Sequence, residues 1–114
     1  MNLLVTGGCG FIGANFIEYV IGKRRVQKLV NVDCLSYAAS LGNVRSFGKN
    51  PKYLFEEYDL SDYGKVYDTF YKHDITHVVH LAAETHVDNS ILDADAFLSS
   101  NVLGTHSLLK AALK

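Results

Sequence analysis

The chain has 114 residues, of which 48% are hydrophobic and 20% are charged, and its net charge is −1. This composition is ordinary for one globular domain, and the charge gives no attraction to nucleic acid or to an anionic membrane. No apolar run approaches the roughly 20 residues of a membrane span, and no signal peptide is expected. The two cysteines, Cys9 and Cys34, are too few for a disulfide framework and indicate a reduced, cytoplasmic protein.

Strands and helices are predicted to alternate along the chain, because short apolar runs alternate with stretches of helical spacing. In chain order the predicted elements are a strand over residues 2–6, a helix over 11–21, a strand over 28–33, a short helix over 40–47, a turn at 50–51, a strand over 53–58, a helix capped by Ser61–Asp62 and ending near His73, a strand over 76–83, and a long helix over 93–113. Strands that alternate with helical crossovers form a parallel sheet with helices on both faces. The sequence therefore predicts one α/β domain of the Rossmann type, of which this chain carries four strands.

The stretch TGGCGFIG, residues 6–13, places four glycines between the first strand and the first helix. The spacing Gly7-x-x-Gly10-x-x-Gly13 suits a tight turn whose backbone approaches a pyrophosphate at the helix N-terminus. A glycine-rich turn without a ligand is the alternative. Asp33, at the end of the second strand and 20 residues after Gly13, favours the functional interpretation, because its carboxylate can accept hydrogen bonds from adenosine ribose hydroxyls. It would repel a 2′-phosphate, and no arginine follows it, so NAD is favoured over NADP.

Five stretches of this sequence resemble one enzyme family. They are TGGCGFIG at 6–13, DCLSYA at 33–38 (D-K-L-T-Y-A in the family), DL at 59–60, LAAETHVDNS at 81–90 (A-A-E-S-H-V-D-R-S in the family, from Ala82 on) and NVLGT at 101–105 (N-V-x-G-T in the family). Together they resemble the dTDP-glucose 4,6-dehydratases of the NAD-dependent epimerase/dehydratase family, in the extended short-chain dehydrogenase/reductase superfamily. Cys34, Thr85 and Asn89 depart from the family residues, which keeps a UDP-glucose 4,6-dehydratase or a nucleotide-sugar epimerase relative as the alternative.

The resemblance also implies a binding role for individual residues. The pyrophosphate would be held by Gly7, Gly10, Phe11, Ile12 and Gly13, the adenosine ribose by Asp33, Cys34, Leu35 and Ser36, the adenine by Asp59 and Leu60, and the nicotinamide half by Leu81, Ala82, Ala83, Glu84 and Thr85, with Ser100 also touching the cofactor. Thr85 would in addition reach the hexose of the substrate. No metal site is expected, because His77 and His80 fall on opposite faces of one strand.

The family's reaction dehydrates a nucleotide-hexose, dTDP-glucose or UDP-glucose, to its 4-keto-6-deoxy form through transient hydride transfer to NAD. Its catalytic Tyr-x-x-x-Lys and Thr-Asp-Glu groups have no counterpart here. The match at Tyr19 and Lys23 is rejected, because it lies at the far end of the helix that begins at the pyrophosphate. The chain alone is therefore expected to be inactive and marginally stable or self-associating. The full enzyme would be a homodimer, and a separate C-terminal chain could complement this one; a non-catalytic dinucleotide-binding fragment is the alternative.

Cys9 allows two interpretations. It lies between glycines at the start of a helix, where the helix dipole can lower a thiol pKa and make the sulfur reactive. The simpler interpretation is that the turn requires only a small residue at this position.

Overall fold

A computed structural model of the chain describes residues 1–34, 46–82 and 104–113. The described strands are β1 (Asn2–Thr6), β2 (Lys28–Asp33), β3 (Tyr53–Glu57) and β4 (His77–His80), and the described helices are α1 (Phe11–Val20), α2 (Tyr63–His73) and α5 (Gly104–Ala112).

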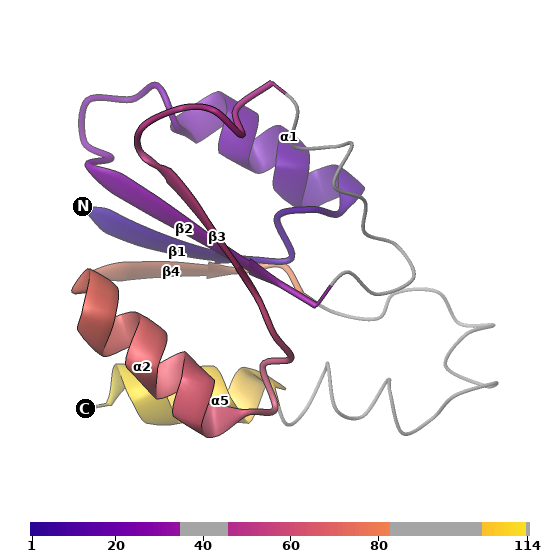
Figure 1. Cartoon of the computed structure of the whole chain (residues 1–114), viewed down its shortest axis with the longest axis vertical. Coiled ribbons are helices and arrows are strands. Elements are labelled where there is room, and N and C mark those ends of the chain that lie inside the picture. Colours follow the sequence, from indigo (N-terminus) through magenta and orange to yellow (C-terminus); the bar gives the residue numbers. More distant parts are fainter. Residues whose placement is uncertain (35–45, 83–103, 114) are drawn as a thin grey trace, which may run out of the picture.

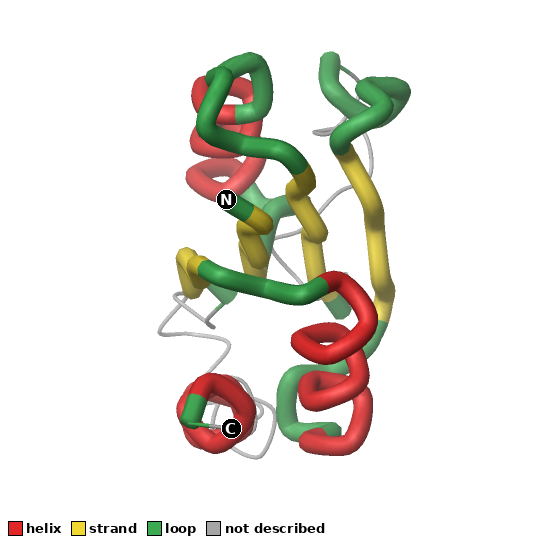
Figure 2. Tube along the Cα trace, turned by 90° about the vertical axis from the view of Figure 1, so that its left-hand side faces the viewer, coloured by secondary structure: helices red, strands yellow, loops and turns green. Residues whose placement is uncertain are grey.

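The four strands form one parallel sheet in the order β3-β2-β1-β4. Helix α1 covers one face of the sheet, whereas α2 and α5 lie side by side on the other face (Figures 1 and 2). Within the described residues, β1 and β2 are the two inner strands and β3 and β4 are the edges. This arrangement confirms the predicted Rossmann-type α/β fold with helices on both faces.

The two inner strands are apolar throughout because each of their faces is covered by a helical layer. Alternate residues such as Leu3 and Val5 pack with Ile17 of α1 in one core cluster. Leu4 lies on the opposite face, where it joins a second cluster that includes Val66 of α2. In the ladder, Leu4 pairs with a residue of β2 on one side and of β4 on the other, so the two clusters are separated by a single sheet.

Helix α2 begins and ends as the sequence predicts. The Asp62 side chain accepts a hydrogen bond from the Lys65 N–H at 3.3 Å, which satisfies one of the backbone donors that a helix start leaves over. At the other end, Asp74 adopts a left-handed conformation with φ 53° after His73. Both observations confirm the predicted boundaries of this helix.

Several predicted boundaries differ by a few residues. Helix α1 ends at Val20, and Ile21 is its C-cap. Strand β3 ends at Glu57, because the next residue, Tyr58, turns into the core. Strand β4 covers only residues 77–80, because its partner strand β1 ends at Thr6. The end of the predicted helix over 40–47 is wrong, since residues 46–49 form turns in which the Asn50 N–H donates to the Phe47 carbonyl at 2.9 Å. The rest of that helix, Ala83, and the predicted helical residues 93–103 lie outside the described part.

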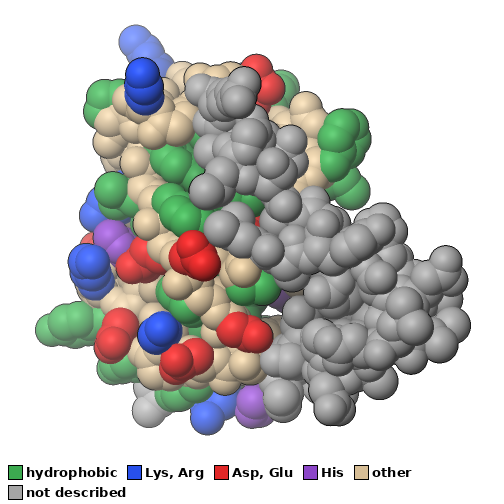
Figure 3. Space-filling view, turned by 45° about the vertical axis from the view of Figure 1, so that its right-hand side comes forward, with side chains coloured by type: hydrophobic (Ala, Val, Ile, Leu, Met, Phe, Trp, Pro, Cys, Tyr) green, Lys and Arg blue, Asp and Glu red, His purple; other side chains and the backbone are tan. Residues whose placement is uncertain are grey.

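The surface carries charges of both signs. In Figure 3 the described acidic and basic side chains are interspersed over the same face rather than gathered into patches of one sign. Within the described part of the chain, no helix combines the length and the apolar character that crossing a membrane requires.

Candidate functional site

The candidate site lies where the direction of strand succession reverses. From β1 the chain adds β2 and β3 on one side, and it then returns to place β4 on the other side of β1. In open parallel sheets, ligands bind at the carboxyl ends of the strands beside such a switch point. Figure 1 shows the turn between β1 and α1 at this end of the sheet.

Gly7 opens the turn in a conformation that favours glycine. Its φ is +74°, and a Cβ placed on it would lie 2.7 Å from the backbone of both Leu81 and Ala82. The Gly7 N–H donates to the Val32 carbonyl of β2 at 2.9 Å. The first glycine of the motif therefore sits between β2 and the end of β4, with no room for a side chain.

Gly13 allows helix α1 to approach the turn. A Cβ on Gly13 would overlap the Gly7 carbonyl oxygen and lie 2.8 Å from both the Gly7 carbonyl carbon and the Gly8 Cα. Gly10 is the N-cap of α1, and its N–H donates to the Gly7 carbonyl at 3.1 Å. The motif spacing thus performs the two steric tasks for which the sequence predicts it, a tight turn and close packing of a helix against it.

The first turn of α1 presents its backbone amides without a side-chain cap. Gly10 supplies no capping group, and the first turn contains no acidic residue. The N–H groups at the start of a helix have no acceptor within the helix, and the helix dipole favours an anion there. An anionic group such as a pyrophosphate fits this end of α1.

The turn itself is held by two polar side chains of β2. Asn31, which is fully buried, accepts a hydrogen bond from the Gly8 N–H through Oδ1 at 2.9 Å and donates through Nδ2 to the Tyr53 hydroxyl at 3.0 Å. The Asp33 carboxylate accepts from the Cys9 N–H at 3.0 Å. Four successive amides, residues 7 to 10, thereby donate to protein acceptors, so the turn is fixed by the protein itself.

Sequence analysis missed Asn31 and Gly8. Asn31 is an amide in the middle of an otherwise apolar strand, which was a detectable signal for a special role. A Cβ on Gly8 would collide with the Asn31 carboxamide, so Gly8 is required at its position as much as the glycines of the predicted spacing.

Cys9 is buried against the same groups. Burial, and then the nearby Asp33 carboxylate, raise the pKa of the Cys9 thiol to about 11. A thiol with this pKa is almost wholly protonated at neutral pH. The interpretation of Cys9 as a reactive thiol is therefore wrong, and the requirement for a small residue remains.

The end of β4 is bound to the end of β1 through Thr6. The Thr6 hydroxyl accepts from the N–H groups of Leu81 and Ala82 at 3.0 and 3.2 Å. It also lies 2.6 Å from His80 Nδ1, and His80 Nε2 lies 2.9 Å from the Thr105 hydroxyl of α5. Burial lowers the pKa of His80, which favours the neutral imidazole.

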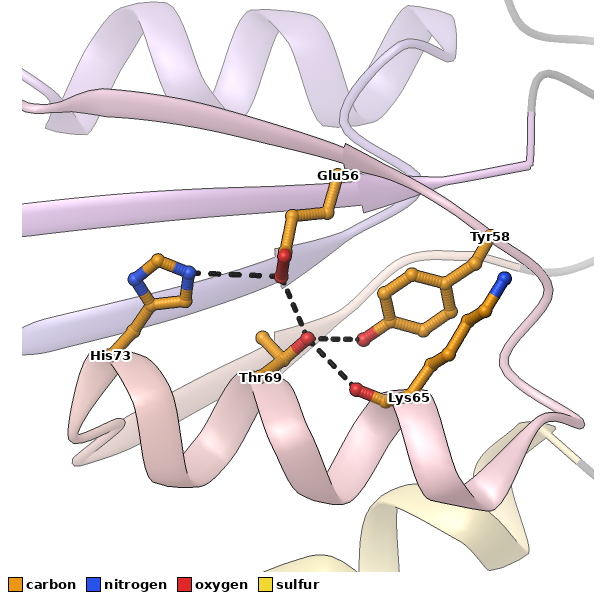
Figure 4. A network of polar contacts seen from close by, with 5 residues as sticks. All are labelled: Glu56, Tyr58, Lys65, Thr69 and His73. Carbon is orange, nitrogen blue, oxygen red and sulfur yellow. Dashed lines mark hydrogen bonds and ion pairs between the residues drawn. The ribbon is translucent and has the colours of Figure 1, made fainter.

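A second polar cluster lies between β3 and α2 (Figure 4). The Thr69 hydroxyl lies 2.7 Å from a Glu56 carboxylate oxygen and 3.0 Å from the Lys65 carbonyl oxygen, so its one proton serves these acceptors. The Tyr58 hydroxyl, 2.7 Å away, must then donate to Thr69. Burial raises the pKa of Tyr58 to about 12 and lowers the pKa of His73, whose Nε2 lies 3.7 Å from the Glu56 carboxylate. This cluster fixes α2 on the sheet.

The remaining predicted site residues are placed as follows. Cys34 is exposed and follows β2, and the Asp59 carboxylate accepts from the Ser61 N–H at 2.9 Å. The Leu60 side chain is buried in the core beneath α2 and α5. Six further predicted residues lie outside the described part: Leu35, Ser36, Ala83, Glu84, Thr85 and Ser100.

The rejected pair lies away from this site. Tyr19 is in the last turn of α1, 71% exposed, and the Lys23 ammonium stands 4.5 Å above its ring. The turn that holds the glycines is at the opposite end of the helix.

The chain is similar to proteins of one enzyme family. A family model described as GDP-mannose 4,6 dehydratase matches residues 4–114. A dTDP-glucose 4,6-dehydratase of Haemophilus influenzae is 44% identical over 112 residues, which cover 98% of this chain and 33% of the relative. The crystal structure of DesIV, a dTDP-glucose 4,6-dehydratase from Streptomyces venezuelae with NAD bound, aligns with a TM-score of 0.91 and 35% identity over 99% of this chain and 36% of its own.

A UDP-glucose 4-epimerase from Thermotoga maritima aligns almost as closely, with a TM-score of 0.85 and 31% identity over 99% of this chain and 34% of its own. The chain thus spans about a third of the length of these relatives. The resemblance to the dTDP-glucose 4,6-dehydratases is confirmed, and it concerns their N-terminal portion. The chain belongs to the GDP-mannose 4,6 dehydratase family and is homologous to the N-terminal third of the dTDP-glucose 4,6-dehydratases.

Proposed function

We propose that residues 1–114 form the N-terminal part of an NAD-binding Rossmann domain and bind NAD at the carboxyl ends of β1, β2 and β4. The observation that carries this proposal is the preformed turn between β1 and α1. Its glycines allow α1 and the end of β4 to pack closely against the turn, and the backbone amides of residues 7 to 10 already donate to acceptors in the protein. The uncapped first turn of α1 is left for the pyrophosphate. The same cofactor is bound in the DesIV structure.

The adenosine half would lie over the end of β2. Asp33 would accept from the ribose hydroxyls, with Cys34, Leu35 and Ser36 beside it and Asp59 and Leu60 at the adenine. The Leu60 side chain is in the core, so its contribution would come from the backbone. Ala83, Glu84, Thr85 and Ser100 would complete the nicotinamide side together with Leu81 and Ala82.

The proposed activity is the dehydration of a nucleotide-hexose, dTDP-glucose or UDP-glucose, in a protein that also contains the remaining two thirds of the family's length. Bound NAD supplies a hydride acceptor that later returns the hydride. Residues of this chain bind and orient the cofactor, and Thr85 would also reach the hexose. A homodimer of the full enzyme, or complementation by a separate C-terminal chain, belongs to this proposal.

A cytoplasmic location is also proposed. Both cysteines lie within the described residues and neither is in a disulfide, which fits a reducing compartment.

The cofactor proposal is tested by titrating the purified chain with NAD, NADP and AMP in a calorimeter. We expect NAD to bind more tightly than NADP, because Asp33 lies at the ribose end of the site. Replacing Asp33 with Asn should narrow this difference, whereas Glu18→Gln, a neutralisation on α1, should leave it unchanged. Equal affinity for the two dinucleotides in the wild-type chain would contradict the assignment of Asp33.

The activity is tested by adding the C-terminal two thirds of the Haemophilus influenzae relative as a separate polypeptide and measuring 4-keto-6-deoxy sugar formation from dTDP-glucose and UDP-glucose. Activity that requires both pieces would support the dehydratase proposal, and the preferred donor would identify the nucleotide. If the two pieces form a stable complex that binds NAD but shows no turnover, the alternative of a non-catalytic dinucleotide-binding fragment would be favoured.

A further inference from the structure

His80 connects three elements at the edge of the proposed NAD site. It is the last residue of β4, it contacts Thr6 at the end of β1, and it contacts Thr105 in the first turn of α5. In the ladder His80 is directly paired with Thr6, so the two side chains are neighbours on one face of the sheet. None of the cofactor contacts proposed above involves this histidine.

The proton positions in this network follow from counting donors and acceptors. The Thr6 oxygen has two lone pairs, and both backbone N–H groups that point at it, those of Leu81 and Ala82, can only donate. The Leu81 N–H is shared with the Thr6 carbonyl, also at 3.0 Å, but neither N–H group can accept a proton. Among the described contacts of the Thr6 hydroxyl, only His80 Nδ1, at 2.6 Å, can accept, so the hydroxyl proton is directed to it. A nitrogen that accepts cannot carry a proton in a neutral ring, so the proton is on Nε2 and is donated to the Thr105 oxygen at 2.9 Å.

The position of Leu81 and Ala82 matters because these residues touch the glycine turn. A Cβ on Gly7 would lie 2.7 Å from Ala82 N and Cα and from the Leu81 carbonyl carbon. The backbone at the end of β4 therefore forms one wall of the turn. Leu81 is held there in part by its backbone hydrogen bond to the Thr6 carbonyl at 3.0 Å, whereas the Ala82 N–H donates to the Thr6 hydroxyl at 3.2 Å. The position of Ala82 therefore depends on the Thr6 hydroxyl oxygen, whose orientation depends on the acceptor at His80.

We infer that His80 is a positioning residue, held as the neutral Nε2–H tautomer. By accepting the Thr6 hydroxyl proton at Nδ1, it sets the Leu81–Ala82 backbone against the glycine turn. By donating from Nε2 to Thr105, it also holds the start of α5 at the end of β4. The effect on cofactor binding rests on the proposed NAD function. The tautomer and the order of the backbone do not depend on it.

The tautomer is tested first, on the wild-type chain labelled with ¹⁵N-histidine. Long-range ¹H–¹⁵N spectra at neutral pH should show His80 protonated at Nε2 and unprotonated at Nδ1, and Thr105→Val should shift the Nε2 resonance. A proton on Nδ1, or a doubly protonated ring, would overturn the inference directly.

Three variants then separate the two nitrogens. In His80→Asn the side-chain oxygen can take the place of Nδ1 and accept from Thr6, in His80→Gln the amide reaches only the place of Nε2, and His80→Leu keeps neither. His106→Asn, an exposed position on α5, is the control. The measurements are amide hydrogen exchange at Leu81 and Ala82 and the dissociation constant for NAD.

We expect His80→Gln and His80→Leu to speed exchange at Ala82 and to weaken NAD binding about five- to tenfold, the loss of one buried hydrogen bond. His80→Asn should recover most of both properties, and His106→Asn should change neither. Equal effects of all three His80 variants would mean that the ring only fills space, which overturns the inference. Should His80→Leu not fold, the Asn and Gln pair decides. If the wild-type chain does not bind NAD, the proposed function is wrong. The hydrogen-exchange rates at Leu81 and Ala82 and the tautomer of His80 would still test the role of His80.

Discussion

Gly13 and Gly64 give opposite predictions for the same substitution. Both lie in the first turn of a helix, and alanine is preferred to glycine inside helices by roughly 1 kcal/mol. On Gly64 the new methyl would lie 3.6 Å from an Asp62 carboxylate oxygen, an ordinary contact. Gly64→Ala should therefore stabilise the chain by up to about 1 kcal/mol.

On Gly13 the methyl would overlap the Gly7 carbonyl oxygen and lie 2.8 Å from two further backbone atoms. Backbone cannot yield as a flexible side chain can, so α1 must move away from the turn. Overpacking of this kind costs about 1–3 kcal/mol. After the gain in helix propensity of roughly 1 kcal/mol is subtracted, Gly13→Ala should destabilise the chain by up to about 2 kcal/mol, with a fall in Tm of roughly 4–8 °C for each kcal/mol.

Urea unfolding followed by circular dichroism measures both variants beside the wild type. We expect the midpoint to rise for Gly64→Ala and to fall for Gly13→Ala. In a parallel titration Gly13→Ala should weaken NAD binding at least about tenfold, because the helix start that is proposed to face the pyrophosphate would have moved. A rise in the midpoint for both variants would refute the steric reasoning on Gly13.

Three other predictions concern ionisation and the sheet edge. The pKa of Tyr58 is raised to about 12, so between pH 10 and 12 the folded chain binds more protons than the unfolded chain. The free energy of unfolding should therefore fall as the pH rises from 10 to 12, and it should fall less steeply in Tyr58→Phe. Urea unfolding midpoints measured across this pH range test both expectations. Ellman's reagent at pH 8 should modify the exposed Cys34 quickly and Cys9 only at the rate of unfolding, and two fast equivalents would contradict the burial of Cys9. In the described chain β4 pairs only with β1, so the 114-residue protein should associate with rising concentration; Val78→Lys, which charges this edge, should reduce the mass measured by light scattering.

The fold was predictable because its information is local in the sequence. Short apolar runs separated by helical spacing determine the alternation of strands and helices, and a parallel sheet covered on both faces follows from it. The glycine spacing and the sequence separation between Gly13 and Asp33 were also visible in the sequence, since both belong to one strand–turn–helix–strand unit. The structure brings Asp33 and the turn together, because the Asp33 carboxylate accepts from the Cys9 N–H. The ribose contact of Asp33 stays a prediction.

The supporting contacts were not predictable because they depend on register. Asn31 reaches Gly8 only because β1 and β2 pair with Val5 opposite Asn31, and Thr6 meets His80 only because β4 adds to the far side of β1. Composition and periodicity carry no information on such pairings. The predicted end of the short helix at Phe47 was wrong for a similar reason. Phe47 is buried, and its ring makes an edge contact with the Tyr53 ring, 5.0 Å away between ring centres, which sequence periodicity does not show.

The backbone amides of the turn and those of the first turn of α1 have different roles, and this difference explains how the site can be preformed. Residues 7 to 10 donate their amides to Val32, Asn31, Asp33 and Gly7, so the turn is ordered without a ligand. The next amides belong to the first turn of α1, where the helix itself has no acceptor to offer. An incoming pyrophosphate would then find donors that are already oriented, and little of its binding energy would be spent on ordering the loop. Since two of the four acceptors are β2 side chains, the strand that bears the carboxylate proposed to bind the ribose also sets the shape of the turn proposed to receive the pyrophosphate.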